Sequence, residues 1–202
     1  SYELINQNKS YGYVKLHAPG MHNILNSLAA AAIGFDLNIN KEKIIEGIKS
    51  YGGVRRRFEI KGVKNDIMIV DDYAHHPSEV KATLEAAKTG WKRRLVAVFQ
   101  PHLYSRTKDF YKNFAKALLK SNINILLPIY PAREKPIKNI SSDLIKKELK
   151  VLNHTKTYIC SDKESLLHLI NEIKQNNDII VFMGAGDIYK MIKPTYDKIN
   201  EK

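Results

Sequence analysis

The sequence predicts an α/β protein in which a doubly wound, mostly parallel sheet follows a smaller N-terminal unit. From Phe58 onward, short β-branched segments alternate with helical segments, which is typical of a parallel sheet with helices on both faces. The strand segments are continuously apolar and do not alternate with polar residues, as expected for strands that are buried on both sides. These two observations carry the prediction.

The N-terminal segment is expected to hold strands followed by two helices. Weak alternation over residues 1–18 predicts one or two strands. An alanine-rich helix is expected at 22–33, ended by Gly34. A second helix is expected at about 40–51, because its isoleucines recur at helical spacing.

A domain boundary is expected near residue 56, after the turn or hinge that Gly52-Gly53 allows. The segments after this boundary alternate in type. Strands are expected at 58–63, 67–70, 95–99, 123–129, 157–159 and 179–183. Helices are expected at about 77–90, 105–120, 141–149, 162–175 and 187–196.

The composition is that of an ordinary soluble globular protein, with 44% hydrophobic and 27% charged residues. No run of 18 apolar residues occurs, so we expect no membrane span and no membrane partner. The single cysteine, Cys160, fits a reducing cytoplasmic compartment and is expected in the core. The net charge of +12 comes mostly from scattered lysines, so small anionic substrates are favoured over nucleic acid.

A cluster of acids and histidines follows the strand expected at 67–70. It includes Asp71, Asp72, Tyr73 and His75. Ligands of parallel sheets bind at the carboxyl ends of the strands, so this cluster predicts a functional site. The alternative is that Asp71 or His76 only caps the helix that begins at Pro77.

A second candidate pair follows the strand expected at 95–99. His102 and Arg106 are four residues apart and share a face if a helix begins there. An arginine at a helix start is unfavourable for the helix dipole unless an anion binds nearby, so we expect a carboxylate ligand. The alternative is a surface salt bridge.

Two further strand ends carry weaker signals. The loop 130–136 has two prolines and several charges, which reach either a ligand or only water. Gly184-Ala185-Gly186 allows an anion to approach the backbone. The third glycine of a dinucleotide fingerprint is missing, however, so a tight packing turn is the favoured interpretation.

Near the N-terminus, two carboxamides three residues apart open the alanine-rich helix. These are Asn23 and Asn26, with His22 beside them. Such side chains suit recognition of an uncharged ring edge, as in a nucleotide base.

Five ordered motifs together resemble the Mur ligases, the ATP-dependent amino-acid-adding enzymes of peptidoglycan synthesis. They are P-G-M-H-N-I-L-N (19–26), G-V-R-R-R-F-E (53–59), D-D-Y-A-H-H-P-S-E-V (71–80), F-Q-P-H-L-Y-S-R-T (99–107) and Y-P-A-R-E-K-P-I (130–137). The Y-A-H-H-P and Q-P-H-L-Y-S-R-T segments point to the members that join L-alanine to UDP-N-acetylmuramate through an acyl phosphate.

The resemblance implies that residues 1–56 are the C-terminal part of a central ATP-binding domain. Residues 57–202 would then be the Rossmann-like, amino-acid-binding C-terminal domain. The phosphate-binding loop, the Mg²⁺ ligands and the UDP-sugar domain of the family have no counterpart in this chain. We therefore expect the chain alone to be inactive, with no catalytic residue and no metal ligand of its own.

The resemblance also implies residue roles. It places His22, Asn23, Asn26, Arg57 and Asp72 on the nucleotide, and Tyr73, His75, His102 and Arg106 around the incoming amino acid. Arg106 would hold the carboxylate of that amino acid. Leu103 departs from the arginine often found there, so a second guanidinium contact is not expected.

Two other functions compete with this interpretation. One is the recycling ligase of the same family, which attaches a preformed tripeptide to the same sugar. The other is a non-catalytic Rossmann-like binding module. Each predicts a different ligand at the strand ends.

Overall fold

The computed structural model describes residues 1–17 and 19–199 of the chain. Its contacts divide the chain into two compact units, Ser1–Arg55 and Arg56–Lys202. The division lies next to the boundary expected near residue 56. Within the described residues, no helix is long and apolar enough to cross a membrane.

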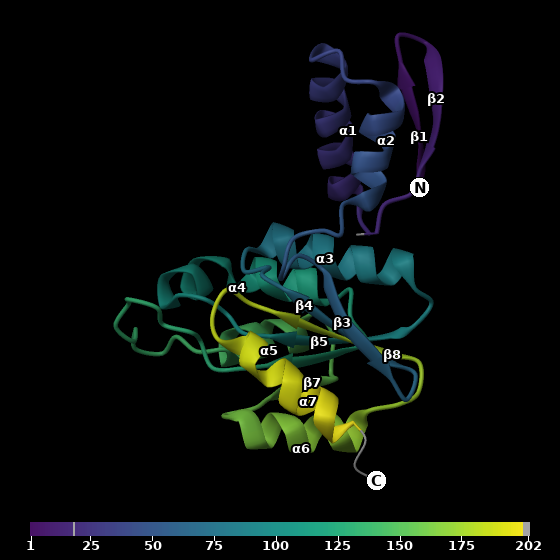
Figure 1. The fold of residues 1–202 in the computed structure, drawn as a ribbon. Helices are drawn as coiled ribbons and strands as arrows, with labels where there is room; N and C mark the ends of the chain where they lie inside the picture. The colour runs from purple at the N-terminus through teal and green to yellow at the C-terminus, as the bar shows by residue number, and fades with distance from the viewer. Residues whose placement is uncertain (18, 200–202) are drawn as a thin grey trace. The chain divides into compact units, whose positions relative to one another are not determined.

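The first unit packs an antiparallel hairpin against two helices (Figure 1). Its elements are β1 (Tyr2–Asn6), β2 (Lys9–Val14), α1 (Met21–Asp36) and α2 (Lys41–Ser50). Asn40 begins α2 by accepting a hydrogen bond from the Glu42 backbone N–H at 2.8 Å, as is usual for an asparagine N-cap. The small core comprises Leu4, Val14, Ala31, Ile44 and Ile48.

Helix α1 does not end at Gly34, where the sequence predicts a stop, but continues to Asp36. Gly34 is buried, and a Cβ atom on it would lie 2.9 Å from Cγ1 of Ile44 on α2. The absence of a side chain therefore lets the two helices approach closely. The expected helix end is wrong because this glycine has a packing role.

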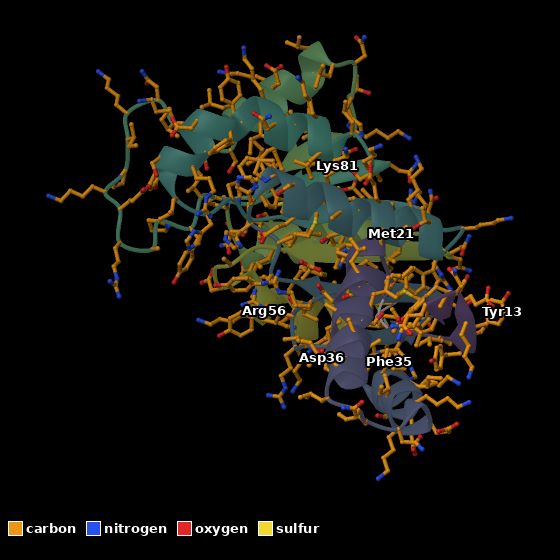
Figure 2. The ribbon with its side chains drawn as sticks, turned by 90° about the horizontal axis from the view of Figure 1, so that it is seen from above. Tyr13, Met21, Phe35, Asp36, Arg56 and Lys81 are labelled. Atoms are coloured by element: carbon orange, nitrogen blue, oxygen red, sulfur yellow. The ribbon has the colours of Figure 1, made fainter. Side chains whose placement is uncertain are left out.

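Helix α1 buries only part of its surface within the first unit. Met21, Leu25 and Ile33 are 69%, 58% and 62% exposed. Figure 2 labels Met21 and Asp36, which mark the two ends of this helix.

The second unit is built on one six-stranded sheet in the order β3-β4-β8-β5-β6-β7. Its strands are β3 (Glu59–Lys64), β4 (Ile67–Asp72), β5 (Arg94–Phe99), β6 (Ile123–Leu126), β7 (Thr157–Ile159) and β8 (Asp178–Met183). Only the β3–β4 pair is antiparallel; the other neighbouring pairs are parallel. The predicted fold class, a doubly wound and mostly parallel sheet, is confirmed.

Helices cover both faces of this sheet (Figure 1). Side chains of α3 (Pro77–Gly90), α4 (Tyr104–Leu118) and α5 (Asp143–Val151) bury one face. Side chains of α6 (Lys163–Ile173), the 3₁₀ helix η1 (Ile188–Met191) and α7 (Ile192–Lys198) bury the other. The single helix expected at 187–196 is thus two successive helical segments.

Three details of the second unit differ from or complete the expectations. Strand β6 ends at Leu126 and not at 129, because Pro128 lacks the N–H that a continuing ladder needs. Cys160 is buried, as expected. Trp91, after α3, stacks on Phe58 with ring centroids 5.5 Å apart and planes 7° from parallel.

The sheet register brings three strand ends level with one another. Asp72 pairs with Met183, and Phe99 pairs with the same Met183 from the other side. The segments that follow β4, β5 and β8 therefore leave the sheet at one edge. This edge holds the candidate site.

Candidate functional site

Aromatic and imidazole rings from three strand ends form a chain of contacts. Tyr73 and His75 follow β4, His102 follows β5, and Tyr130 follows β6. Ring centroids are 5.2 Å apart for Tyr73–His75, 5.8 Å for His75–His102 and 5.7 Å for His102–Tyr130. The structure therefore brings together three residues that the sequence assigns to one ligand. It adds Tyr130, which the sequence left undecided.

In the described part of the chain, three buried nitrogen atoms in or beside this ring chain lack a hydrogen-bond partner, and one of them, Nε of Arg56, still faces Oδ1 of Asp71 at 3.5 Å. Among the described residues, Nδ1 of His102 and Nη1 of Arg106 have no hydrogen-bond partner. Arg106 also makes no ion pair within residues 1–17 and 19–199, so the salt-bridge alternative is wrong there. Because buried polar groups are nearly always paired, these two nitrogens are suited to a ligand.

The pKa of His102 lies below the ordinary histidine value. Burial is the main cause, and the charges of Arg106 and His75 add to it, while Glu134 opposes them. His102 is therefore neutral at neutral pH, and one of its ring nitrogens can accept a hydrogen bond.

We expect His102 to titrate at lower pH in the folded chain than in the urea-unfolded chain. Since the unfolded state binds the proton more readily, the free energy of unfolding should fall as the pH decreases through the ordinary histidine value. Histidine side-chain NMR over a pH series measures this directly. A His102 titration at or above the unfolded value would contradict it.

Arg56 lies against the rings of Tyr73 and Tyr189, and the sequence did not single it out as a site residue. Its guanidinium lies 4.9 Å from the Tyr73 ring centroid and 4.8 Å from that of Tyr189. Nη2 donates to the Gly184 carbonyl at 2.6 Å, and Nε lies 3.5 Å from Oδ1 of Asp71. The Arg56 backbone has φ of 57°, in the left-handed region.

Asp71 belongs to the same buried network. Burial raises the pKa of its carboxyl group, and the neighbouring Arg56 opposes that rise. The alternative that Asp71 caps α3 is wrong, because its carboxylate faces Arg56, but the same alternative is confirmed for His76, which is the N-cap residue of this helix. At the start of α3, Glu79 accepts hydrogen bonds from the backbone N–H groups of His75 and His76 at 3.0 and 3.1 Å.

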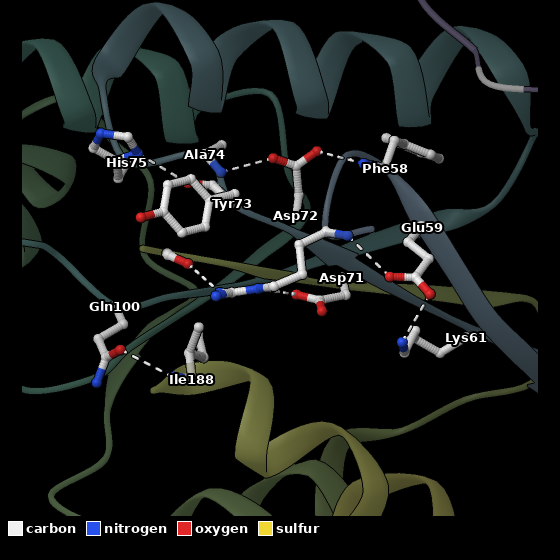
Figure 3. Close-up of polar contacts among 12 residues, drawn as sticks. Phe58, Glu59, Lys61, Asp71, Asp72, Tyr73, Ala74, His75, Gln100 and Ile188 are labelled. Carbon is white, nitrogen blue, oxygen red and sulfur yellow. Dashed lines mark hydrogen bonds and ion pairs between the residues drawn. The ribbon is translucent and has the colours of Figure 1, made fainter. Parts of the chain in front are cut away.

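Asp72 uses its carboxylate on the backbone of its own unit. One oxygen accepts from the Phe58 N–H at 2.8 Å and the other from the Ala74 N–H at 2.7 Å (Figure 3). The residue is 6% exposed, and burial raises its pKa while these bonds oppose the rise. Asp72 therefore has a local structural role, and its contact with a nucleotide stays a prediction.

Arg57 points outward, unlike Arg56. Its side chain is 56% exposed, and Nη1 lies 3.9 Å from Oε1 of Glu79. The motif at 53–59, which holds three successive arginines, carries no signal for which of them turns inward. A phosphate could reach Arg57, and that role also stays a prediction.

The predicted base-recognition residues lie at the start of α1. His22 and Asn26 are exposed. Nδ2 of Asn23 donates to the Pro19 carbonyl at 2.7 Å, which ties the helix start to the preceding turn. The two exposed side chains are accessible to a ligand, and their role stays a prediction.

The glycine turn after β8 packs tightly. A Cβ on Gly186 would lie 2.5 Å from both Oε1 of Gln100 and Cγ of Tyr130. Gln100 links this turn to the end of β5, since it accepts from the Ile188 N–H at 3.1 Å (Figure 3). Its Nε2 also donates to Oδ1 of Asp187 at 2.9 Å. The favoured interpretation, a packing turn, agrees with these contacts.

Residues 56–186 match the protein family described as "Mur ligase, glutamate ligase domain". This match covers more than half of the chain and includes every residue of the ring chain. The chain belongs to the Mur ligase family.

Curated relatives agree with this membership. The Mur ligase chain is 44% identical over 191 residues to a UDP-N-acetylmuramate–L-alanine ligase of Geotalea daltonii, covering 94% of this chain and 42% of the relative. A protein of the same name from Clostridium tetani is 44% identical over 190 residues, covering 94% and 41%. The chain thus spans about two fifths of the length of these relatives.

A solved structure gives the same result. The crystal structure of UDP-N-acetylmuramate–alanine ligase from Thermotoga maritima superposes with a TM-score of 0.78 at 30% identity. The superposition covers 92% of this Mur ligase chain and 39% of that one.

Two further findings concern the described residues of the Mur ligase chain outside the ring chain. A shallow groove of about 470 Å³ runs between α3 and α4, and its lining includes Lys81, Phe110, Lys116 and Lys120 but none of the predicted site residues. Among the residues that the structure describes, no group of three or more His, Cys, Asp or Glu side chains is placed to hold a metal ion.

Proposed function

We propose that this chain is part of an ATP-dependent ligase that joins L-alanine to the carboxylate of UDP-N-acetylmuramate in peptidoglycan precursor synthesis. The observation that carries this proposal is the 44% identity, over nearly the whole chain, to proteins of that name. The protein would work in the cytoplasm, where its substrates are small molecules and not nucleic acid.

The second unit is the amino-acid-binding part in this proposal. The unpartnered Nη1 of Arg106 would bind the alanine carboxylate, for which the planar guanidinium is well suited. His102, neutral at neutral pH, would accept a hydrogen bond from the alanine amine. Tyr73 and His75 would form the wall beside it.

The role of these residues is orientation. In the proposed reaction the sugar carboxylate takes the γ-phosphoryl group of ATP, which releases ADP and forms an acyl phosphate. The alanine amine then attacks the acyl carbon, and phosphate leaves. Holding the amine near the reactive carbon contributes up to roughly 7–11 kcal/mol in well-oriented systems. The residues of this chain bind and orient, and none of them needs to form a covalent bond.

The proposed nucleotide contacts are assigned residue by residue. His22, Asn23 and Asn26 would face the adenine, Arg57 the phosphates, and Asp72 the nucleotide side of the site. Mg²⁺ would neutralise phosphate charge when bound, and residues outside this chain would hold it. The chain alone is therefore expected to form no product from ATP, L-alanine and the UDP-sugar.

Titration of the chain with L-alanine, followed by NMR, tests the amino-acid site. We expect saturable shifts at His75 and His102, and weaker ones with D-alanine as the matched control. Titrations with glycine and L-serine, compared with L-alanine, rank the preference of the site among small amino acids. Binding of a tripeptide in place of alanine would favour the recycling ligase, and binding of neither would favour a non-catalytic module.

A further inference from the structure

The loops after β5 and β6 are tied together around His102. Tyr130 donates its backbone N–H to the Pro101 carbonyl at 2.8 Å, and its own carbonyl accepts from the Leu103 N–H at 2.9 Å. The rings of His102 and Tyr130 stack with their planes 15° apart. The residues on both sides of His102 are thus fixed by one residue of the next loop.

Glu134 continues this contact into helix α4. Its Oε2 accepts from the Ser105 backbone N–H at 3.0 Å, and its Oε1 accepts from the Ser105 hydroxyl. These hydrogen bonds hold the pKa of Glu134 below its usual range. The carboxylate therefore stays charged at neutral pH.

Among the residues that the structure describes, no other side chain caps the start of helix α4. This helix begins after Leu103, whose side chain cannot form a hydrogen bond, and its first turn holds no acidic residue. The first N–H groups of a helix lack partners within the helix, and a negative charge there is stabilising. The Glu134 carboxylate, 29 residues further along the chain, supplies both an acceptor for the Ser105 N–H and a negative charge at the helix start.

We propose that Glu134 is a positioning residue of the amino-acid site, acting through Ser105 to hold Arg106 and His102 in place. Arg106 follows Ser105 directly and extends from the turn that Glu134 caps. His102 precedes the same turn and stacks on the loop that carries Glu134. A fixed helix start lowers the conformational entropy lost when a ligand binds. The inference rests on the proposed function of this site.

The charge of Glu134 provides a second readout. His102 is faced by Arg106 and His75, which lower its pKa, and by Glu134, which raises it. Removing the Glu134 charge should therefore move the His102 titration to still lower pH. A residue that only stabilised the helix without facing the site would not have this effect.

The experiment compares Glu134→Ala and Glu134→Gln with Asp162→Ala in the same chain. Asp162 is the matched control, because it caps α6 by accepting from the Ser165 N–H at 2.8 Å. We expect Glu134→Ala to weaken L-alanine binding about tenfold and to speed hydrogen exchange at Ser105. Asp162→Ala should leave both unchanged.

Glu134→Gln separates geometry from charge, since glutamine can still accept from the Ser105 N–H. We expect it to recover part of the L-alanine affinity while His102 still titrates at lower pH than in the unmodified chain. It also decides the result if Glu134→Ala does not fold.

The outcomes of this experiment separate the inference from the proposed function. Unchanged His102 titration and unchanged Ser105 exchange in both Glu134 variants would overturn the inference. If the unmodified chain does not bind L-alanine, the proposed function fails, and these two NMR readouts still test the positioning role.

Discussion

Replacing Arg106 with alanine is expected to lower the affinity of the second unit for L-alanine by about a hundredfold. Nη1 of Arg106 is buried without a partner among the described residues, so its burial is best compensated by a bound carboxylate. Hydrogen bonds between two charged groups are stronger than those between neutral groups, and the Arg106→Ala substitution would remove all those that the guanidinium makes. NMR titration or calorimetry with L-alanine measures the loss.

Two further variants control this result. Arg106→Lys keeps the charge but not the planar fork, and should bind with intermediate affinity. Lys108→Ala removes an exposed cation from the same helix and should leave binding unchanged. Equal affinity of Arg106→Ala and the unmodified chain would remove Arg106 from the site.

Replacing Asp72 with alanine is expected to lower the free energy of unfolding of the second unit by about 3 kcal/mol. Two backbone N–H groups, those of Phe58 and Ala74, would lose their acceptor. Each unpaired buried group costs about 1–3 kcal/mol. Burial raises the pKa of Asp72, so its charge itself costs free energy in the folded state. The expected loss of stability is therefore smaller than the largest penalty for two unpaired N–H groups.

Urea unfolding followed by circular dichroism tests this prediction. Asp72→Asn should lose nearly as much stability. The two N–H groups bond to different carboxylate oxygens, and the asparagine amide has only one oxygen. Asp109→Ala, at an exposed position on α4, should stay within about 0.5 kcal/mol of the unmodified chain. A stable Asp72→Ala variant would mean that other groups satisfy these N–H donors.

The sheet of the second unit could be predicted because its signals are local. Strands β4 and β8 contain the continuous apolar runs 67–70 and 179–183, and both strands are buried along their whole length. Pro77 occupies the first turn of α3, a favoured position for proline. The predicted helix end at Gly34 is wrong, because a single sequence does not distinguish a glycine that ends a helix from one at a contact between two helices.

The candidate site could be predicted only in part. Tyr73, His75 and His102 follow buried strands, so the rule for parallel sheets finds them. Tyr130 and Glu134 lie in a loop with no periodicity, and their contacts with Pro101 and Ser105 arise only when β5 and β6 pair. The contacts of Arg56 with Gly184 and Asp71 likewise arise only in the folded unit, because these residues are far from it in the sequence or on another strand.

The stacked pair of Trp91 and Phe58 has a practical consequence. Trp91 is the only tryptophan in the chain, so intrinsic tryptophan fluorescence reports on the second unit and is silent for the first. Phe58 also donates its backbone N–H to Asp72, which couples this optical signal to the loop beside the candidate site. A fluorescence transition and a circular dichroism transition recorded on one sample would therefore separate the unfolding of the two units.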